Sequence, residues 1–399
     1  MAHTTENGGK SQPSSFVGKK IIRAATIGMS LNIFCRGLLT ELSQEGYEVI
    51  ALSSPDDDLA ELGSREHVRT IGVNMERHMS PLKDLLSLFK LTKVMIKEKP
   101  CMVHSMTPKA GLLCMLAAWM ARVPLRVHTF TGLVWPTSTG LSRKILMMTD
   151  RITCFCATHV IPEGEGVKHD LQTCITRKPM RVLGYGNVKG VDLGYWKRTE
   201  KSQADSCVKE KKCFTFIFVG RVVRDKGINE LVHAFSRLHK HYPDTRLLLV
   251  GPAEDNLDPI LPETRKMIEE EVAIVSVGSQ KDVRPYYEES DVMVFPSYRE
   301  GFPNVVLEAG AMELPSIVTD INGSREIIKD GVNGVIVPPR ETDALFEAME
   351  GMVRCPEEVE RMGTNSRSII AARYEQGFVR TCLKQFYSEL FSKNVCGLR

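Results

Sequence analysis

The sequence predicts an α/β protein of two doubly wound parallel-sheet domains, and three observations support this. The chain has 399 residues, which suits two domains better than one. Short apolar segments alternate with helical segments of about 10–15 residues, as in right-handed βαβ units. The polar stretch 199–212 interrupts the alternation, which then starts again. We therefore expect two Rossmann-like domains joined by a linker, with a ligand cleft between the carboxyl ends of both sheets.

The first domain is expected at residues 19–198, after a tail at residues 1–18. This tail is polar and lacks the apolar stretch of a signal peptide. The first strand runs into Gly28, and Gly46 ends the helix that follows. The strands expected in this domain are 20–27, 47–52, 102–104, 125–129 and 152–161, and the helices are about 32–44 and 109–121.

The second domain is expected at residues 213–375, followed by a C-terminal helix and tail at 376–399. The last helix, about 376–391, has no strand to return to, so we expect it to cross back to the first domain. The strands expected in the second domain are 214–219, 246–250, 272–277 and 292–295, and the helices are 228–239 and 305–312, with mostly helix after residue 338.

Composition narrows the class of protein. Residues 1–199 carry 26 Lys and Arg against 17 Asp and Glu, and residues 200–399 carry 26 against 32. A basic first half fits contact with an anionic partner and equally a solvated basic surface. The 11 cysteines are scattered without a CxxC pair, which predicts reduced thiols of a cytoplasmic protein. No apolar run approaches the roughly 18 residues that a membrane-spanning helix needs.

The strongest local pattern follows the strand expected at 292–295. The stretch 296–304 (PSYREGFPN) is a turn containing Gly and Pro before a helix, so amide groups of the first helical turn are free to bind phosphate. Glu308, one turn into the helix, could accept hydrogen bonds from a vicinal diol such as a ribose, and Glu300 precedes the turn. The alternative is an ordinary strand–turn–helix with a solvated Glu300 and a helix-dipole role for Glu308.

A second pattern, Gly220-Arg221 followed by Lys226-Gly227, ends the first strand expected in the second domain. Gly220 lets the backbone turn, and the two cations would lie at the mouth of the sheet. Fixed cations there would stabilise the charge of a departing diphosphate without a metal. A basic surface turn is the alternative. Because both patterns arise at the carboxyl ends of strands in one sheet, together they favour a diphosphate site.

Glu300-x7-Glu308, with Gly220-Arg221 and Lys226-Gly227 upstream, resembles the donor signature of the family 4 retaining glycosyltransferases of GT-B architecture. The first half is similar to bacterial members that make envelope and capsular polysaccharides on polyprenyl diphosphate. The resemblance covers roughly residues 20–390. The further stretches that carry it are GYEV (46–49), SPLKDL (80–85), VHSMTPKAGL (103–112), VHTFTGL (127–133) and GVD (190–192).

The resemblance implies a role for each matching residue. Arg221 and Lys226 would grip the donor diphosphate and Glu300 would face the transferred hexose, which makes these three the catalytic set. Glu308 would hold the ribose hydroxyls. Further donor contacts are implied for Gly28, Gly220, Gly301, Phe302, Pro303 and Asn304, and acceptor contacts for Thr107, Lys109 and Thr131.

Four other features are not assigned a catalytic role. Many family members carry a histidine where this chain has Thr131, so a histidine role at that position does not transfer. His104 and His128 are interpreted as packed or hydrogen-bonded histidines at strand ends. The run Asp56-Asp57-Asp58 lacks a second ligand set and is interpreted as a solvated turn. The resemblance implies no metal and no cofactor apart from the UDP-sugar donor.

Residues 81–99 are typical of a basic amphipathic helix. Such a helix can lie on anionic lipid and bring the cleft to a lipid-linked acceptor. A core-facing helix with a lysine-rich outer face is the alternative. No nucleic-acid-binding module accompanies the charge. The apolar set is Leu82, Leu85, Leu86, Phe89 and Met95, and the basic set is Lys83, Lys90, Lys93, Lys97 and Lys99.

Together these features predict a metal-independent retaining transferase, peripheral on the inner face of the plasma membrane. It would move a hexose or N-acetylhexosamine from a UDP-sugar to a polyprenyl-diphosphate-linked saccharide in bacterial surface polysaccharide or glycan biosynthesis. A UDP-sugar epimerase on the same scaffold and a non-catalytic sugar-nucleotide binder stay open as alternatives. The sequence does not specify the sugar, the linkage or the oligomeric state.

Overall fold

The computed structural model describes residues 18–76, 80–199, 213–254 and 258–395. The tail expected at 1–18, apart from Gly18, and the linker expected at 199–212, apart from Thr199, therefore lie outside the described residues, as do the last four residues of the chain.

The chain divides into two compact units. Unit 1 comprises Met1–Thr129 and Asp150–Val160, and unit 2 comprises Phe130–Thr149 and Ile161–Arg399. Each unit contains most of one six-stranded sheet. This division differs from the domains expected from the sequence. Residues 130–149 and 161–198, expected in the first domain, are grouped by their contacts with unit 2.

The sheet of unit 1 has the strand order β3-β2-β1-β4-β5-β6, and the neighbours from β3 to β5 pair in parallel. Helix α5 (Pro108–Met120) buries seven of its residues, as its apolar sequence predicts, while Trp119 and Met120 near its end are about half exposed. The strands are β1 (Lys20–Ala24), β2 (Glu48–Ser53), β3 (Arg69–Gly72), β4 (Met102–Met106), β5 (Leu125–Phe130) and β6 (His159–Pro162), and the other helices are α1 (Gly28–Phe34), α2 (Leu38–Gln44), α3 (Asp57–Glu66), α4 (Pro81–Glu98) and α6 (Gly140–Cys156).

Two expectations for this half of the chain are wrong. Residues 152–156 end helix α6 instead of opening a strand, and β6 begins only at His159. The run ITCFC contains residues with strand propensity, but a short apolar run is ambiguous, and here it continues an amphipathic helix that buries Cys154 and Cys156. The helix expected at 32–44 is two helices, because Gly37 adopts a φ of 74° and starts α2 anew.

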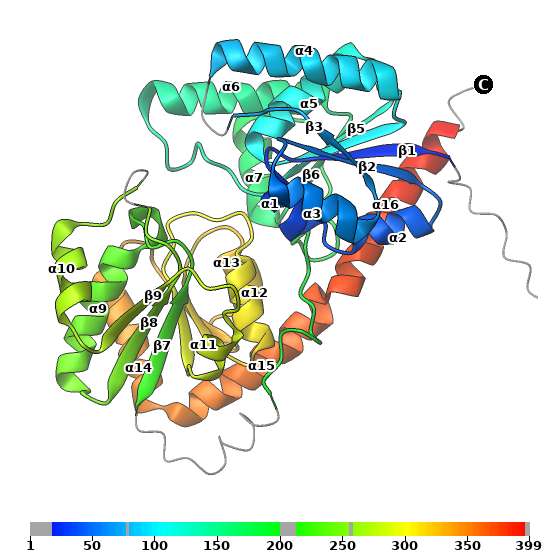
Figure 1. Ribbon diagram of the computed structural model, residues 1–399. Helices are drawn as coiled ribbons and strands as arrows, with labels where there is room; N and C mark the ends of the chain where they lie inside the picture. Colours follow the sequence, from blue (N-terminus) through cyan, green and yellow to red (C-terminus); the bar gives the residue numbers. More distant parts are fainter. Residues whose placement is uncertain (1–17, 77–79, 200–212, 255–257, 396–399) are drawn as a thin grey trace, which may run out of the picture. The chain divides into compact units, whose positions relative to one another are not determined.

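The sheet of unit 2 has the order β12-β11-β10-β7-β8-β9, with every neighbouring pair parallel. Helices cover both of its faces, so the predicted second doubly wound sheet is present (Figure 1). The strands are β7 (Phe214–Val219), β8 (Thr245–Val250), β9 (Ile274–Gly278), β10 (Val292–Phe295), β11 (Ser316–Thr319) and β12 (Gly334–Val337). The helices are α7 (Glu165–Cys174), η1 (Arg224–Lys226), α9 (Ile228–His241), α10 (Pro262–Glu270), α11 (Arg284–Glu288), α12 (Asn304–Ala311), α13 (Ser324–Ile327), α14 (Thr342–Arg354), α15 (Pro356–Tyr374) and α16 (Gln376–Val395).

The final helix, α16, packs against a segment that the sequence assigned to the first domain. Arg181 forms an ion pair of 2.8 Å with Glu389, and the backbone at Gly184 lies against the ring of Phe378. Contact grouping places both partners in unit 2. The helix therefore fastens the segment around residue 184 to the unit that carries the second sheet.

Within the described residues, no helix has the length and apolar content needed to cross a bilayer. None of the nine cysteines in this part of the chain forms a disulfide. No cluster of three or more His, Cys, Asp or Glu side chains that could ligate a metal is found among the same residues.

Candidate functional site

The predicted catalytic residues follow the two strands at which the sheet of unit 2 reverses its order. From β7 the chain proceeds outward through β8 and β9, and β10 to β12 lie on the other side of β7. The loops after β7 and β10 therefore lie at the topological switch point, at the carboxyl edge where open α/β sheets bind their ligands. Arg221 and Lys226 lie in the first loop, and Glu300 lies in the second.

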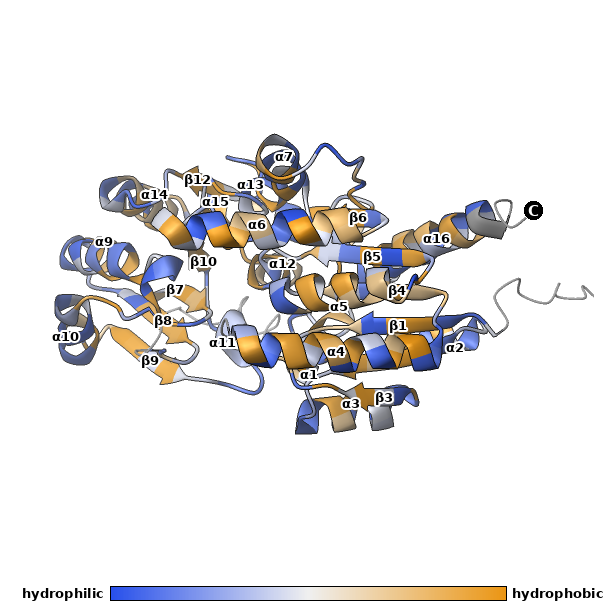
Figure 2. Ribbon diagram, turned by 90° about the horizontal axis from the view of Figure 1, so that it is seen from above, coloured by the Kyte–Doolittle hydropathy of each residue, from blue (hydrophilic) through white to orange (hydrophobic). Residues whose placement is uncertain are grey.

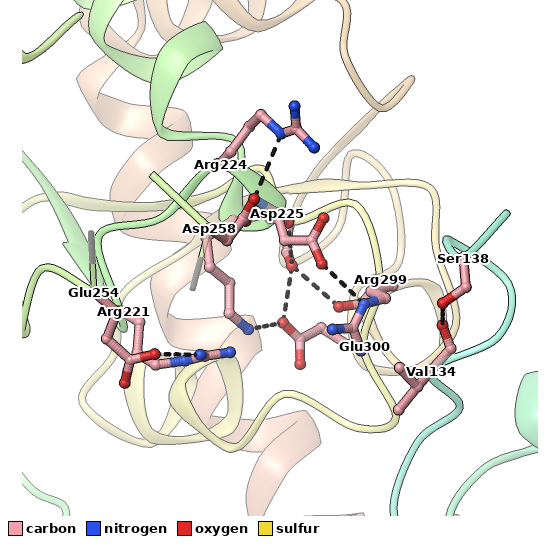
Figure 3. A network of polar contacts seen from close by, with 11 residues as sticks. Val134, Ser138, Arg221, Arg224, Asp225, Glu254, Asp258, Arg299 and Glu300 are labelled. Atoms are coloured by element: carbon pink, nitrogen blue, oxygen red, sulfur yellow. Dashed lines mark hydrogen bonds and ion pairs between the residues drawn. The ribbon is translucent and has the colours of Figure 1, made fainter. Parts of the chain in front are cut away.

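Glycine makes the close approach of these two loops possible. Gly227 has a φ of 71°, and a Cβ there would collide with the carbonyl oxygen of Pro296 in the other loop. Two contacts from Asp225 join the loops: its carbonyl accepts a 2.8 Å hydrogen bond from the backbone N–H of Tyr298, and its carboxylate pairs with Arg299 at 3.0 Å. The loops thus form one polar network (Figure 3).

Lys226 and Glu300 are brought into direct contact. The Lys226 ammonium forms an ion pair with the Glu300 carboxylate, which also accepts a 2.9 Å hydrogen bond from the Ser297 hydroxyl. Arg221 extends elsewhere, to a 2.7 Å ion pair with Glu254 (Figure 3). Each predicted cation therefore already has a carboxylate partner, and an incoming diphosphate would compete with that partner.

The turn before α12 is closely packed backbone. A Cβ at Gly301 would collide with the carbonyl oxygen of Thr131, and one at Gly323 would lie 2.8 Å from the Cα of Phe302. Thr131 is thereby placed beside the Glu300–Gly301 peptide. Helix α12 follows with Pro303 as its N-cap and no side-chain capping bond, so amide groups of its first turn are open to an anion.

Two further residues predicted around the donor have side-chain partners inside unit 2. The ring of Phe302 is buried and packs on Tyr374 with ring centroids 5.5 Å apart, so only its backbone is open to a ligand. The side chain of Asn304 accepts a 3.0 Å hydrogen bond from Asn187. Gly220 directly follows β7 and adopts a φ of 151°. Residues with a side chain rarely adopt this backbone conformation, so glycine allows the turn.

Glu308 lies one turn into α12, buried, where the sequence predicts a partner for a diol. Lys189 donates to one of its carboxylate oxygens at 2.8 Å. Burial raises the pKa of Glu308, and the charge of Lys189 partly offsets this. The sequence analysis did not single out Lys189. The only available signal was its position directly before Gly190-Val191-Asp192, one of the stretches that carry the family resemblance.

Glu163, directly after β6, is a second residue that the sequence analysis missed. It is 2% exposed, and its Oε1 atom has no hydrogen-bond partner among the described residues. Burial, followed by the nearby carboxylates of Glu300 and Glu326, raises its pKa from 4.5 to about 8. Glu163 is therefore a neutral acid at pH 7 in the neighbourhood of the Lys226–Glu300 pair.

Three predicted residues lie at the corresponding switch point of unit 1, between β1 and β4. Gly28 starts α1, and its backbone N–H donates to the Asp56 carboxylate at 2.9 Å. Thr107 starts α5 with a φ of 68°, unusual for a residue with a side chain. Lys109 pairs with both carboxylate oxygens of Asp84, at 2.6 and 2.7 Å.

The remaining interpretations concern unit 1. Asp56 is more than a solvated turn residue, because its side chain caps the N-terminus of α3 through the amide of Leu59 at 2.8 Å. His104 and His128 are both buried and hydrogen-bonded. His104 contacts Thr129 at 2.7 Å, and His128 contacts the Ser105 hydroxyl at 2.8 Å. Burial lowers the pKa of each ring.

Comparison with known proteins identifies the family. Residues 31–186 match the model described as Glycosyl transferase 4-like domain, and residues 199–369 match the one described as Glycosyl transferases group 1. The chain is 30% identical over 386 residues to the capsular polysaccharide biosynthesis glycosyltransferase CapM of Staphylococcus aureus, covering 94% of this chain and 98% of that protein. The chain belongs to the family 4 glycosyltransferases.

Other family 4 glycosyltransferases and solved structures agree. UDP-Gal:alpha-D-GlcNAc-diphosphoundecaprenol alpha-1,3-galactosyltransferase of Escherichia coli is 28% identical over 285 residues, 68% of this chain and 71% of that protein. Sucrose-phosphate synthase from Thermosynechococcus elongatus superposes with a TM-score of 0.77 at 22% identity, covering 94% of this chain and all of that one. HepE of Anabaena, solved with UDP and glucose, gives 0.77 at 17% identity with the same coverage. The predicted GT-B fold is confirmed.

Proposed function

We propose that this glycosyltransferase moves a hexose or N-acetylhexosamine from a UDP-sugar to a polyprenyl-diphosphate-linked saccharide in bacterial surface polysaccharide biosynthesis, with retention at the anomeric carbon. One observation carries the proposal. The Lys226–Glu300 pair lies in the two loops at the switch point of one sheet, the uncapped helix α12 follows one of these loops, and Arg221 follows the same strand as Lys226; this combination suits a sugar diphosphate. The names of the capsular and diphosphoundecaprenol relatives support the acceptor class.

Each group has a distinct part in donor binding. The first-turn amides of α12 and the cations of Arg221 and Lys226 hold the diphosphate, exchanging their present carboxylate partners for phosphate oxygens. Glu308 accepts hydrogen bonds from the ribose hydroxyls. Glu300, released from Lys226, accepts hydrogen bonds from the hexose.

Transfer then needs only positioning and charge stabilisation. The bond between the anomeric carbon and the diphosphate oxygen breaks, and its electron pair leaves with UDP. The acceptor oxygen forms the new bond on the same face, and its proton passes to an oxygen of the departing diphosphate. Once they hold the diphosphate, Arg221 and Lys226 stabilise the oxygen that gains charge and lower the barrier without a divalent metal. Activity in excess EDTA equal to that in Mg²⁺ tests this last point.

The acceptor is proposed to use the switch point of unit 1. Thr107 and Lys109 follow β4 there, and the Lys109 ammonium can exchange Asp84 for an acceptor diphosphate. Lys109 would thus be the anion-binding group for the acceptor, and its place after β4 at the carboxyl edge of the unit 1 sheet supports this.

Contact with an anionic membrane is proposed for α4. Four of its five predicted apolar residues face outward, with Leu82 81% and Phe89 59% exposed, whereas Ser87, Leu91 and Met95 are the buried residues. The alternative, in which these apolar residues face the protein core, is therefore wrong for four of the five and holds only for Met95. Figure 2 shows apolar and hydrophilic residues alternating along α4, where it runs beside α5. The four predicted lysines of α4 and Lys99 at its C-cap are all exposed, which favours an anionic lipid surface.

A donor panel tests the function. The full chain is incubated with UDP-sugars and a short-chain polyprenyl-diphosphate-linked saccharide, and products are identified by mass spectrometry and by the anomeric configuration in NMR spectra. A new α-linked product from an α-linked donor supports the proposal. Donor isomerisation without transfer would favour an epimerase, and binding without turnover would favour a sugar-nucleotide binder.

Sedimentation with vesicles tests the membrane contact separately. We expect wild-type chain to bind vesicles containing phosphatidylglycerol and not pure phosphatidylcholine. The double variant Leu85→Ser/Phe89→Ser should lose at least about fivefold in partitioning, because it removes exposed apolar area. Val272→Ser, at a 93% exposed apolar residue of unit 2, is the matched control. Equal loss in both variants would count against α4 as the contact.

A further inference from the structure

Lys189 is fixed in place by the turn that carries it. Asn187 is 1% exposed and adopts a φ of 58°, and its side-chain oxygen accepts hydrogen bonds from the backbone of Lys189 at 3.0 Å and of Gly190 at 2.6 Å. Its side-chain amide donates to Asn304 at the start of α12. The turn is thus tied to the N-terminus of the helix that bears Glu308.

The other end of the turn is equally constrained. The backbone N–H of Val191 donates to the carbonyl of Tyr374 at 2.8 Å, and the N–H of Gln376 donates back to Val191 at 3.0 Å. Gly190 has a φ of 68°, and a Cβ there would lie 2.6 Å from the Cα of Gln376. Lys189 therefore reaches Glu308 from an anchored backbone, not from a mobile surface loop.

Glu308 needs a partner because of where it lies. Its side chain is 10% exposed, and a buried carboxylate is costly unless a cation or hydrogen bonds accompany it. Among the described residues, its electrostatic partners are Lys189 and Tyr287. Tyr287 is fully buried and its hydroxyl donates to the Val305 carbonyl at 3.2 Å, so it stays neutral and supplies no charge.

We propose that Lys189 is a positioning residue of the nucleotide site, which keeps Glu308 ionised and oriented so that its free oxygen accepts hydrogen bonds from the ribose diol. This inference rests on the proposed function and deepens it. A carboxylate has about four acceptor positions, so the 2.8 Å contact on Oε1 leaves capacity for a diol. A protonated Glu308 would lose acceptor capacity, and selection for ribose would weaken.

The test compares UDP with 2′-deoxy-UDP by isothermal titration calorimetry on the full chain. We expect wild type to bind UDP at least roughly tenfold more tightly than 2′-deoxy-UDP between pH 6 and 9, because the deoxy ligand leaves a buried acceptor unpaired. In Lys189→Met this ratio should fall to about 2 at pH 6 and rise with pH, since loss of the cation raises the pKa of Glu308 further. Lys189→Arg should keep the wild-type ratio.

The ratio cancels effects that act equally on both nucleotides, such as ionisation of the phosphates or of Glu163. A pH-independent wild-type ratio in Lys189→Met would overturn the inference while leaving UDP binding intact. Tighter UDP binding in that variant with an unchanged ratio would also overturn it, because Lys189 would then merely compete with the ligand. Failure of wild type to bind UDP at all would refute the proposed function and this inference with it. Unchanged circular dichroism of both variants shows that they are folded.

Discussion

The substitution Glu163→Gln tests the electrostatics of the site most sharply. Glu163 is buried, and its pKa is raised from 4.5 to about 8 by burial and by Glu300 and Glu326. In the unfolded chain the same carboxyl titrates near its ordinary value. The folded state therefore binds one more proton between these two pH values, and stability falls as pH rises through that window.

The size of this loss follows from the pKa difference. One unit corresponds to about 1.36 kcal/mol, so full ionisation of Glu163 costs the folded state roughly 5 kcal/mol above pH 8. Glutamine has nearly the same shape and cannot ionise, so Glu163→Gln should remove most of this pH dependence. Its amide brings two donors that need partners, which offsets about 1–3 kcal/mol of the gain.

Urea unfolding of wild type and Glu163→Gln at pH 5, 7 and 9 measures the effect. We expect the variant to be less stable than wild type by up to about 2 kcal/mol at pH 5 and more stable by about 2–4 kcal/mol at pH 9. Wild type should also lose more transferase activity than Glu163→Gln between pH 5 and pH 9, because an ionised Glu163 places a further negative charge near Glu300. Glu163→Ala serves as the control for lost packing: it cannot ionise either, so it should lack the same pH dependence and be less stable than Glu163→Gln at every pH. Parallel pH profiles for wild type and Glu163→Gln would refute the assignment of Glu163 as a neutral acid.

Three other outcomes are expected. Lys226→Ala and Arg221→Ala should each lower kcat/KM at least about tenfold in a radiolabelled-donor assay, since each removes a charge-assisted contact. The control is Arg224→Ala, which removes a neighbouring exposed cation and should change kcat/KM by no more than about twofold. An equal loss in this control would indicate a general charge effect. Gly227→Ala should lower the free energy of unfolding by about 1–3 kcal/mol in thermal unfolding, because residue 227 has a positive φ and a Cβ there collides with the facing loop. An unchanged midpoint would disprove that the loops are packed as described. Lys109→Ala should raise KM for the acceptor about tenfold and leave KM for the donor unchanged; the reverse split would move Lys109 to the donor side.

The sequence predicts two parallel sheets because periodicity and chain order determine them, but it misses the four-residue strands β3, β11 and β12, which are too short to give a clear pattern. The strand expected at 292–295 coincides with β10. Errors occur where a local pattern is ambiguous. The run 152–156 has strand propensity yet continues an amphipathic helix, and Gly37 divides a helix that periodicity alone makes continuous.

The candidate site is only partly predictable for a different physical reason. Arg221, Lys226 and Glu300 are predicted from the sequence because they follow strands of one sheet and match a family motif, and their roles stay predictions. Glu163 and Lys189 belong to no such motif, and their importance arises from burial and from partners far away along the chain. Likewise, the outward orientation of the apolar residues of α4 depends on which face packs on α5, and an amphipathic pattern alone does not specify this.

A crystal structure of the chain with UDP tests the central claim most directly. The account predicts the diphosphate at the carboxyl edge of the second sheet, with phosphate oxygens about 2.7–3.2 Å from the Lys226 ammonium, the Arg221 guanidinium and first-turn amides of α12. A nucleotide bound at another edge of the sheet, with Lys226 still paired to Glu300 and Arg221 still paired to Glu254, would contradict it.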